Sequence, residues 1–401
     1  MSQSLGPYTD RYGLVFGYDT SETANSFKGE PTVNLSYNNG QGGSEYLAAP
    51  ISWVNAGSWE YNDNETDVPK PSIPGVDTTN LRVISGRGTA SSSEIQFGCG
   101  FTYVSPSTTY NVSVWYRQSR AGASQPYLRT NITNVGLANL AYNGNTDTST
   151  WPANQWIKIT ASGTTAANED GIYISNYIGT YIGDKIWYFG HQVEQKDHMT
   201  PLVAGTRSST QSLIDISGNK TINTSNASFN SSGELVFDGT NDFLSVGSFN
   251  LYSMGSCTLE AIIYMNNLSS PDNSYSIFGG VSDESYHGYH EIRNSGGYKM
   301  TFWSATDGWR YSNTSLSAQT WYHIAWVWSE RTLTFYLNGA QDGSTTFTTL
   351  SPYGLGFNRI SSFPNERYMN GKISVAKVYS SSLSATEISQ NYNNYKKRFN
   401  I

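Results

Sequence analysis

The densest group of side chains able to bind a ligand lies between Ser282 and Tyr311, in the stretch SDESYHGYHEIRNSGGYKMTFWSATDGWRY. Aromatic rings in this stretch could stack on the apolar faces of sugar rings, while the neighbouring polar groups bind the hydroxyls. The hairpin loops of any tyrosine-rich β-sandwich have a similar composition, so a purely structural role stays open. The candidate glycan-binding residues are Tyr286, His287, Tyr289, His290, Trp303, Trp309 and Tyr311.

Residues for catalysis are harder to find. A retaining glycosidase needs two carboxyl groups about 5–5.5 Å apart, which acidic residues alternating along one strand would supply. The nearest acidic cluster is WEYNDNETD, with Glu60, Asp63, Glu65 and Asp67. Its asparagines and the following Pro69 predict a solvated loop, with calcium binding as a minor alternative, because the glycine and the final glutamate of an EF-hand loop are missing.

Other catalytic and metal-binding patterns are absent from the sequence. It contains no HExxH motif, no Cys/His zinc spacing, no Gly-x-Ser-x-Gly elbow and no glycine-rich phosphate loop. We therefore predict that the chain is not an enzyme and has no cofactor, with calcium left open. Asp238 and Asp242 in the stretch DGTND are weak candidates for calcium ligands, although the same residues are typical of a turn.

The composition excludes several classes of partner. Only 14% of the residues are charged and the net charge is -7, without the concentrated positive charge that nucleic-acid binding needs. The first 20 residues lack the features of a signal peptide, and no stretch is long and apolar enough for a membrane span. We therefore expect synthesis in the cytoplasm and no membrane insertion.

The order of short apolar and aromatic runs predicts an all-β protein with two β-sandwich (jelly-roll) domains. Strands are expected at 110–118, 155–162, 170–179 and 184–194, and a second series runs from 233 to 380. The two series are separated by a polar segment with Pro and Gly. The expected organisation is an arm or anchor over 1–30, a jelly roll over 31–200, a linker over 201–212 and a second sandwich over 213–401. Residues 1–30 could equally contain a short strand, GLVFGY, with flexible ends.

The second sandwich contains the clearest local predictions. The stretch Trp321–Gly339, WYHIAWVWSERTLTFYLNG, is apolar on both faces, which predicts a hairpin in the middle of the sandwich with its tryptophans and His323 mostly in the core. Near the end, Ser384 and Glu387 have the spacing of a capping box. This spacing predicts a helix that packs through Ile388, Tyr392, Tyr395 and Phe399.

The segments LVFDGTNDFLSVG, CTLEAIIYM, TWYHIAWVWS, TLTFYLNG and GKISVAKVYS, in this order, resemble the concanavalin A-like, laminin G-like lectin fold over about residues 210–401. The closing segment from Leu383 to Phe399 resembles the form common in structural proteins of tailed bacteriophages, particularly marine and cyanobacterial ones. FKGEPTVNL (27–35) and HQVEQKDHMTPLVAGTRS (191–208) are similar to segments of such proteins, and the second closes their carbohydrate-binding-module-like jelly roll.

This resemblance implies a virion structural protein, either a capsid decoration or a component of a tail or head fibre. It implies localisation in the virion, contact with other virion proteins and with glycans on the host surface, and a homo-oligomeric state. The sequence leaves two alternatives open. One is a cellular carbohydrate-binding protein, or the non-catalytic module of a polysaccharide-degrading system; the other is an enzyme whose site has no recognised motif.

Overall fold

The described residues of the computed structural model divide into two compact units. The inserted unit comprises the described residues of Thr32–Arg207 and Ser231–Gly233, and the terminal unit comprises those of Ser208–Asn230, of Glu234–Ile401 and of the N-terminal segment that ends at Pro31. The main division between them therefore falls after Arg207, within the segment 201–212. The residues described are 13–36, 50–51, 59–62, 64–73, 76, 78–79, 81–88, 96–130, 136–178, 182–203, 205–280, 289–304, 306–350, 355–363 and 366–401.

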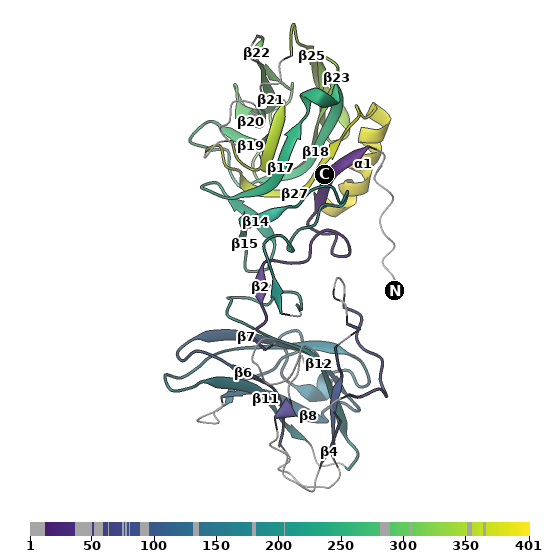
Figure 1. Ribbon diagram of the computed structural model, residues 1–401, viewed down its shortest axis with the longest axis vertical. Helices are drawn as coiled ribbons and strands as arrows, with labels where there is room; N and C mark the ends of the chain where they lie inside the picture. Colours follow the sequence, from purple (N-terminus) through teal and green to yellow (C-terminus); the bar gives the residue numbers. More distant parts are fainter. Residues whose placement is uncertain are drawn as a thin grey trace. The chain divides into compact units, whose positions relative to one another are not determined.

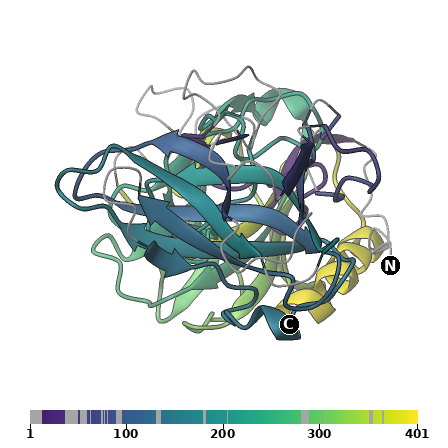
Figure 2. The same cartoon turned by 90° about the horizontal axis from the view of Figure 1, so that it is seen from below.

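The inserted unit contains two five-stranded antiparallel sheets, whose strands are seen from below in Figure 2. One sheet has the order β10 (Ile157–Thr164), β7 (Thr109–Gln118), β12 (Lys185–Glu194), β5 (Ile84–Gly88) and β4 (Trp59–Asn62). The other has the order β3 (Pro50–Ile51), β6 (Gln96–Tyr103), β11 (Gly171–Ile178), β8 (Ser124–Thr130) and β9 (Gly136–Asn139). The short strands β2 (Thr32–Val33) and β13 (Thr206–Arg207) pair separately, and η1 (Thr148–Thr150) is a 3-10 turn.

The core of the inserted unit follows from strand alternation. Every second residue of β7 points to the same side, so that Val112, Val114 and Tyr116 are buried together with Ile172 and Ile174 of β11 in the other sheet. Burial of these side chains between two sheets confirms the sandwich that the sequence predicts for this part of the chain.

The terminal unit is a second two-sheet sandwich (Figure 1). Its first sheet has the order β15 (Ser228–Phe229), β16 (Leu235–Asp238), β27 (Asn370–Tyr379), β18 (Ser256–Met265), β23 (Trp321–Ser329), β24 (Thr332–Leu337) and β25 (Ala340–Thr346), with β1 (Leu14–Asp19) also paired to β27. Its second has the order β14 (Asn223–Asn226), β17 (Phe243–Asn250), β26 (Gly356–Ile360), β19 (Ser274–Gly279), β20 (His290–Asn294), β21 (Tyr298–Ser304) and β22 (Gly308–Tyr311). The 3-10 turn η2 (Tyr252–Met254) follows β17.

The tryptophan-rich hairpin lies in the middle of the first sheet, as the sequence predicts. β23 pairs with β18 on one side and with β24 on the other. Trp326 and Trp328 are buried between the two sheets, and their indole N–H groups donate to Thr301 O and His290 Nε2, each at 3.1 Å. Both rings therefore belong to the core and are not exposed platforms for a ligand.

The single predicted helix is α1 (Ala385–Phe399), which begins with the predicted capping box of Ser384 and Glu387. Its buried stripe differs from the prediction at one position, because Asn391 is buried while Tyr392 is half-buried. The Asn391 amide donates to Glu260 Oε2 at 3.0 Å, and His323 Nε2 lies 2.7 Å from Glu260 Oε1. The buried carboxylate of Glu260 needs a hydrogen-bond donor from the helix, so the buried position is occupied by Asn391, where helical periodicity alone predicts an apolar residue.

Strand β1 corrects the prediction of a separate arm over residues 1–30. Leu14–Asp19 pairs antiparallel with β27, and Phe16 and Tyr18 are fully buried in the core of the terminal unit. Arg398 at the end of α1 donates to both carboxylate oxygens of Asp19, at 2.8 and 2.9 Å. Figure 1 shows β1 in purple beside the yellow α1. The alternative of a short strand is the correct one, and residues 1–12 lie outside the described part of the chain.

Candidate functional site

Three aromatic side chains that the sequence singles out lie together on the outer face of the second sheet. Trp303 of β21 is paired in register with Trp309 of β22. The ring of Tyr289, just before β20, lies 5.0 Å from that of Trp303 and 5.9 Å from that of Trp309. The alternate residues Met300 and Phe302 point into the core, so Trp303 points away from it. We call Tyr289, Trp303 and Trp309 the aromatic platform.

The other predicted glycan-binding residues have different positions. Tyr311 is half-buried and lies two residues beyond Trp309 on the same strand, and therefore on the same face. His290 points into the core, where its ring lies 5.7 Å from that of Trp326 and its Nε2 accepts the indole N–H of Trp328. Burial lowers the pKa of His290 to about 3. The prediction of His290 as a ligand residue is therefore wrong, and Tyr286 and His287 lie outside the described residues.

Two arginines and a phenylalanine that the sequence analysis did not select border the platform. The guanidinium carbon of Arg293 lies 4.4 Å from the ring centre of Trp309. Phe363 lies 4.9 Å from Tyr289, and the guanidinium carbon of Arg367 lies 4.3 Å above the Phe363 ring. Arg293 is four residues after Tyr289, a spacing that places it on the same strand face. Phe363 and Arg367 come from the distant segment after β26, so sequence spacing does not indicate them.

A buried carboxylate lies on the same face as the platform. Glu291 is fully buried, accepts a hydrogen bond from Ser274 and pairs with Arg367 Nη1 at 2.7 Å. Arg293 Nη1 is 4.0 Å from its other oxygen. Burial alone would lower the pKa of the Arg367 guanidinium, but the neighbouring Glu291 raises it above the ordinary value. The charge of Glu291 is therefore largely compensated by Arg367, and the pair holds the loop after β26 against the sheet.

The weak calcium candidates take part in turn formation. Asp238 Oδ1 accepts from the backbone N–H groups of Thr240 and Asn241, as in an Asx turn. Asp242 Oδ2 accepts from the backbone N–H of Asp238 at 2.9 Å, and burial raises the pKa of Asp242. Within the described ranges, no three His, Cys, Asp or Glu side chains come together in a way that could hold a metal ion.

The acidic cluster of the inserted unit is more ordered than a solvated loop. Its first part forms β4, and Glu65 and Asp67 both pair with Lys185 of β12. Burial would raise the pKa of Glu65, but the Lys185 ammonium and the Ser85 hydroxyl lower it to about 2. The side chain of Glu60 and all of Asp63 lie outside what the structure describes. The described carboxylates therefore neutralise a lysine on the sheet.

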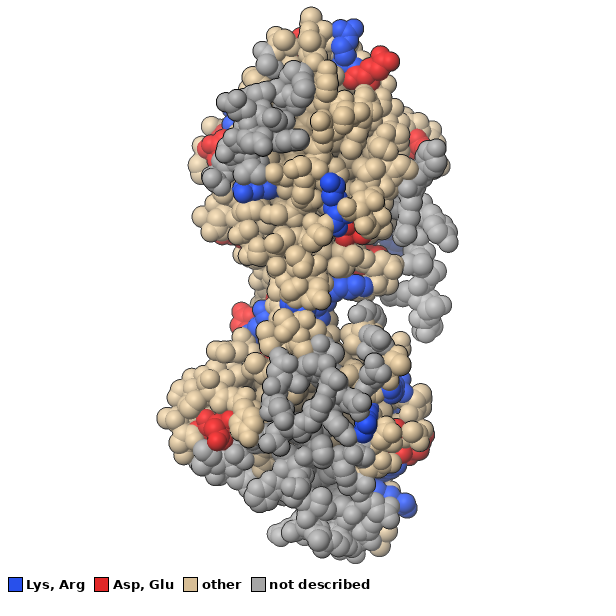
Figure 3. Space-filling view, viewed as in Figure 1, with Lys and Arg blue, Asp and Glu red and all other residues tan. Residues whose placement is uncertain are grey.

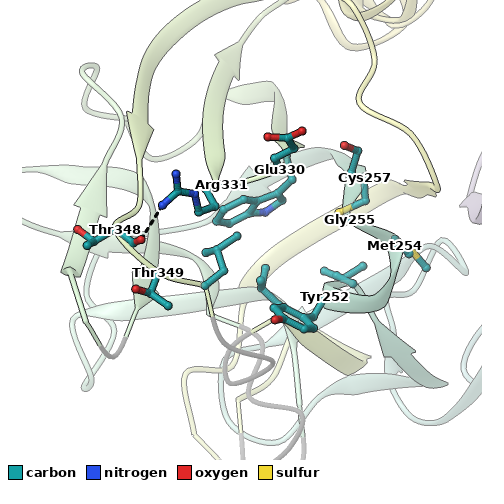
Figure 4. A pocket seen from close by; sticks show the side chains of 13 residues that line it. Tyr252, Met254, Gly255, Cys257, Glu330, Arg331, Thr348 and Thr349 are labelled. Atoms are coloured by element: carbon teal, nitrogen blue, oxygen red, sulfur yellow. Dashed lines mark hydrogen bonds between the residues drawn. The ribbon is translucent and has the colours of Figure 1, made fainter.

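A cavity of about 640 Å³ lies at one end of the terminal sandwich (Figure 4). Its wall is largely apolar and includes Trp328, Leu251, Leu355 and Tyr252, of which Tyr252 is 46% exposed. The turn between β23 and β24 contributes Arg331, whose Nη1 donates to Thr348 O at 2.7 Å. The sequence analysis did not predict this cavity, because its residues come from three separate segments. It is a second place where a ligand could bind.

The sequence comparison with protein families gives one match. Residues 238–389 match the concanavalin A-like lectin/glucanases superfamily. These residues form a concanavalin A-like, laminin G-like domain. The matched range begins at the end of β16 and includes the aromatic platform, the cavity and the first turn of α1. No curated protein matches the chain in sequence.

Solved structures that match part of the chain include a toxin binding domain, a domain of an arabinanase and a sialidase. The botulinum neurotoxin serotype D binding domain has 20% identity and a TM-score of 0.35, over 46% of this chain and 49% of that one. The chain thus spans about half the length of this toxin domain. Domain 4 of AbnA, an arabinanase of Geobacillus stearothermophilus, in complex with arabinotriose, has 15% identity and a TM-score of 0.33. The match covers 46% of this chain and 92% of that domain. A sialidase of Trypanosoma rangeli has 10% identity and a TM-score of 0.37, and the match covers 77% of this chain and 60% of the sialidase. Scores this low do not establish a shared ligand.

No helix in the described part of the chain combines the length and the apolar character needed to cross a bilayer.

Proposed function

We propose that the terminal unit binds glycans through the aromatic platform. The observation that carries this proposal is the position of Tyr289, Trp303 and Trp309, which lie together on the outer face of the sheet, whereas Trp326 and Trp328 of the hairpin are in the core. Half-buried rings held by one another keep a fixed orientation, so little conformational entropy is lost when a sugar ring stacks on them. The lectin-like fold of residues 238–389 supports this use of the surface.

The distribution of charged side chains on the surface fits a protein that binds weakly at each site and gains strength from many sites. On the face shown in Figure 3 the charged side chains form small, separate patches among uncharged residues. A single stacking site of this kind gives modest affinity, and several copies in one assembly raise the apparent affinity by avidity. A homo-oligomer that presents several platforms would therefore bind a glycan-coated surface better than a monomer.

The wider proposal is that the protein is a structural component of a tailed-phage virion, as a capsid decoration or a part of a tail or head fibre. The support is the similarity of residues 27–35, 191–208 and 383–399 to segments of such proteins. In this proposal the protein is made in the host cytoplasm, contacts other virion proteins and is not an enzyme. The ion pair between Glu291 and Arg367 fits a non-catalytic role, since the buried carboxylate is compensated.

A glycan array with the recombinant protein, with and without calcium, tests the binding function. The Trp309→Ala variant removes a ring that would cover about 60–80 Å² of apolar sugar surface, which at ~25 cal/mol per Å² amounts to roughly 1.5–2 kcal/mol. We expect the Kd to rise by about 10- to 30-fold. The control is Tyr252→Ala, which alters the cavity and leaves the platform intact. Loss of binding only in Tyr252→Ala would move the site to the cavity, and an empty array with folded protein would refute a lectin function.

Mass spectrometry of purified virions tests the wider proposal. Virions of a phage that encodes this chain should contain its peptides in amounts comparable to those of other structural proteins. Their absence from intact virions, with peptides present only in the infected cell, would refute the structural role.

A further inference from the structure

Two positive charges lie directly opposite each other beside the aromatic platform. Arg293 of β20 and Lys299 of β21 are paired in register, and both are on the outer face with Glu291 and Trp303. Like charges in directly opposed positions of an antiparallel pair destabilise a sheet. In a chain of net charge -7, such a pair next to a candidate ligand site indicates a partner that carries negative charge.

Among the described residues, the carboxylates near these two cations are engaged mainly by Arg367. Glu291 pairs with Arg367 at 2.7 Å, and Glu366 pairs with Arg367 Nε at 3.2 Å. Arg293 reaches Glu291 only at 4.0 Å, which is beyond hydrogen-bonding distance. No carboxylate of the described residues lies within ion-pair distance of Lys299. Among the described residues of this face, Arg367 therefore has the close carboxylate contacts, while Arg293 has one longer contact and Lys299 has none.

Arg293 is also held in position for recognition. Its guanidinium lies 4.4 Å from the ring centre of Trp309, and its Nη1 is shielded from solvent without a hydrogen-bond acceptor among the described residues. A quarter of the side chain is exposed. Stacking on an indole fixes the plane of a guanidinium, and the exposed edge can then donate two parallel hydrogen bonds to two oxygens of one anionic group.

We propose that the ligand of the aromatic platform is an acidic saccharide. Its sugar ring stacks on Trp303 and Trp309, and its carboxylate or sulfate group binds Arg293 with Lys299 beside it. This inference rests on the proposed glycan binding and specifies the class of sugar. A neutral sugar would bring no negative charge to the opposed cations, whereas an acidic one relieves their repulsion and gains charged hydrogen bonds.

Binding to matched polysaccharides by isothermal titration calorimetry tests this inference. One pair is polygalacturonate and its carboxyl-reduced form, and the other is dextran sulfate and dextran, so that carboxylate and sulfate are tested separately. At low ionic strength we expect at least one acidic member to bind roughly 10-fold or more tightly than its neutral partner, as charged hydrogen bonds predict. The preference should weaken in 0.5 M NaCl.

Single substitutions test which residues cause the preference for acidic over neutral polysaccharides. Arg293→Gln should reduce acidic binding by about 10-fold and leave any neutral binding unchanged, while Arg293→Lys, which keeps the charge but loses the planar fork, should have an intermediate effect. Lys397→Gln, which removes a charge from the exposed face of α1, is the control and should bind as the wild type does. Thermal unfolding verifies that each variant is folded.

Three results would overturn the inference. Equal binding of neutral and acidic polymers would refute the acidic class and leave glycan binding intact. An equal loss in Arg293→Gln and Lys397→Gln would show a general charge effect without a site. Absence of binding to every polymer in this set and on the glycan array would refute the proposed function itself.

Discussion

Replacing Phe16 with alanine should destabilise the terminal unit and leave the inserted unit unchanged. Phe16 is fully buried, and its ring packs edge-on against Tyr18 at 6.2 Å and Phe249 at 5.5 Å. Removal of a buried phenylalanine side chain costs about 3–5 kcal/mol. For a domain of this size each kcal/mol lowers the Tm by roughly 2–4 °C, so we expect a shift of about 6–20 °C.

Differential scanning calorimetry measures this shift, and hydrogen exchange with peptide mass spectrometry assigns each transition to its unit. Thr23→Ala, at an exposed position in the turn after β1, is the control and should leave both transitions in place. A terminal-unit Tm that changes as little in Phe16→Ala as in the control would refute the assignment of β1 to this sandwich. A matching fall in both units would show that the units unfold together.

Two further predictions concern buried polar groups. Burial lowers the pKa of both His191 and His290 from 6.5 to about 3, so the unfolded chain binds more protons than the folded one between these values. The free energy of unfolding should therefore be highest above pH 6.5 and should decrease below it by about 1.4 kcal/mol per pH unit for each histidine. Urea unfolding at pH 7, 6 and 5 measures this decrease. A free energy of unfolding that does not change over these three pH values would contradict the prediction. Asn391→Ala should cost about 1–3 kcal/mol, because Glu260 loses a donor under α1, whereas Asn393→Ala on the exposed face should cost little. Equal urea midpoints for these two variants would show that the Asn391 hydrogen bond contributes nothing.

The local elements with strong patterns could be predicted from sequence. The hairpin Trp321–Gly339 is apolar on both faces because β23 is covered by the core between the sheets on one face and by α1 on the other. The start of α1 could be predicted because Ser384 and Glu387 are three residues apart. Asn391 could not, because the reason for its burial is Glu260, which lies 131 residues earlier in the chain.

The candidate site could be predicted only in part. Trp303 and Trp309 are on adjacent strands joined by a short turn, so their proximity follows from local sequence. His290 differs from Tyr289 by a single position, and alternation along a strand sends neighbouring residues to opposite faces. Arg367 and the cavity depend on contacts between distant segments, for which one sequence contains no periodic signal.

The pairing of β1 with β27 has a consequence for the order in which the chain folds during synthesis. β1 leaves the ribosome early, but the strand that pairs with it and the Arg398 that binds Asp19 are made more than 350 residues later. The inserted unit is almost continuous in sequence, so we expect it to fold while translation is still in progress. The terminal unit depends on contacts of very long sequence separation and should close last. A chain that terminates before α1 would then carry a folded inserted unit beside an incomplete sandwich, and would be a target for proteolysis.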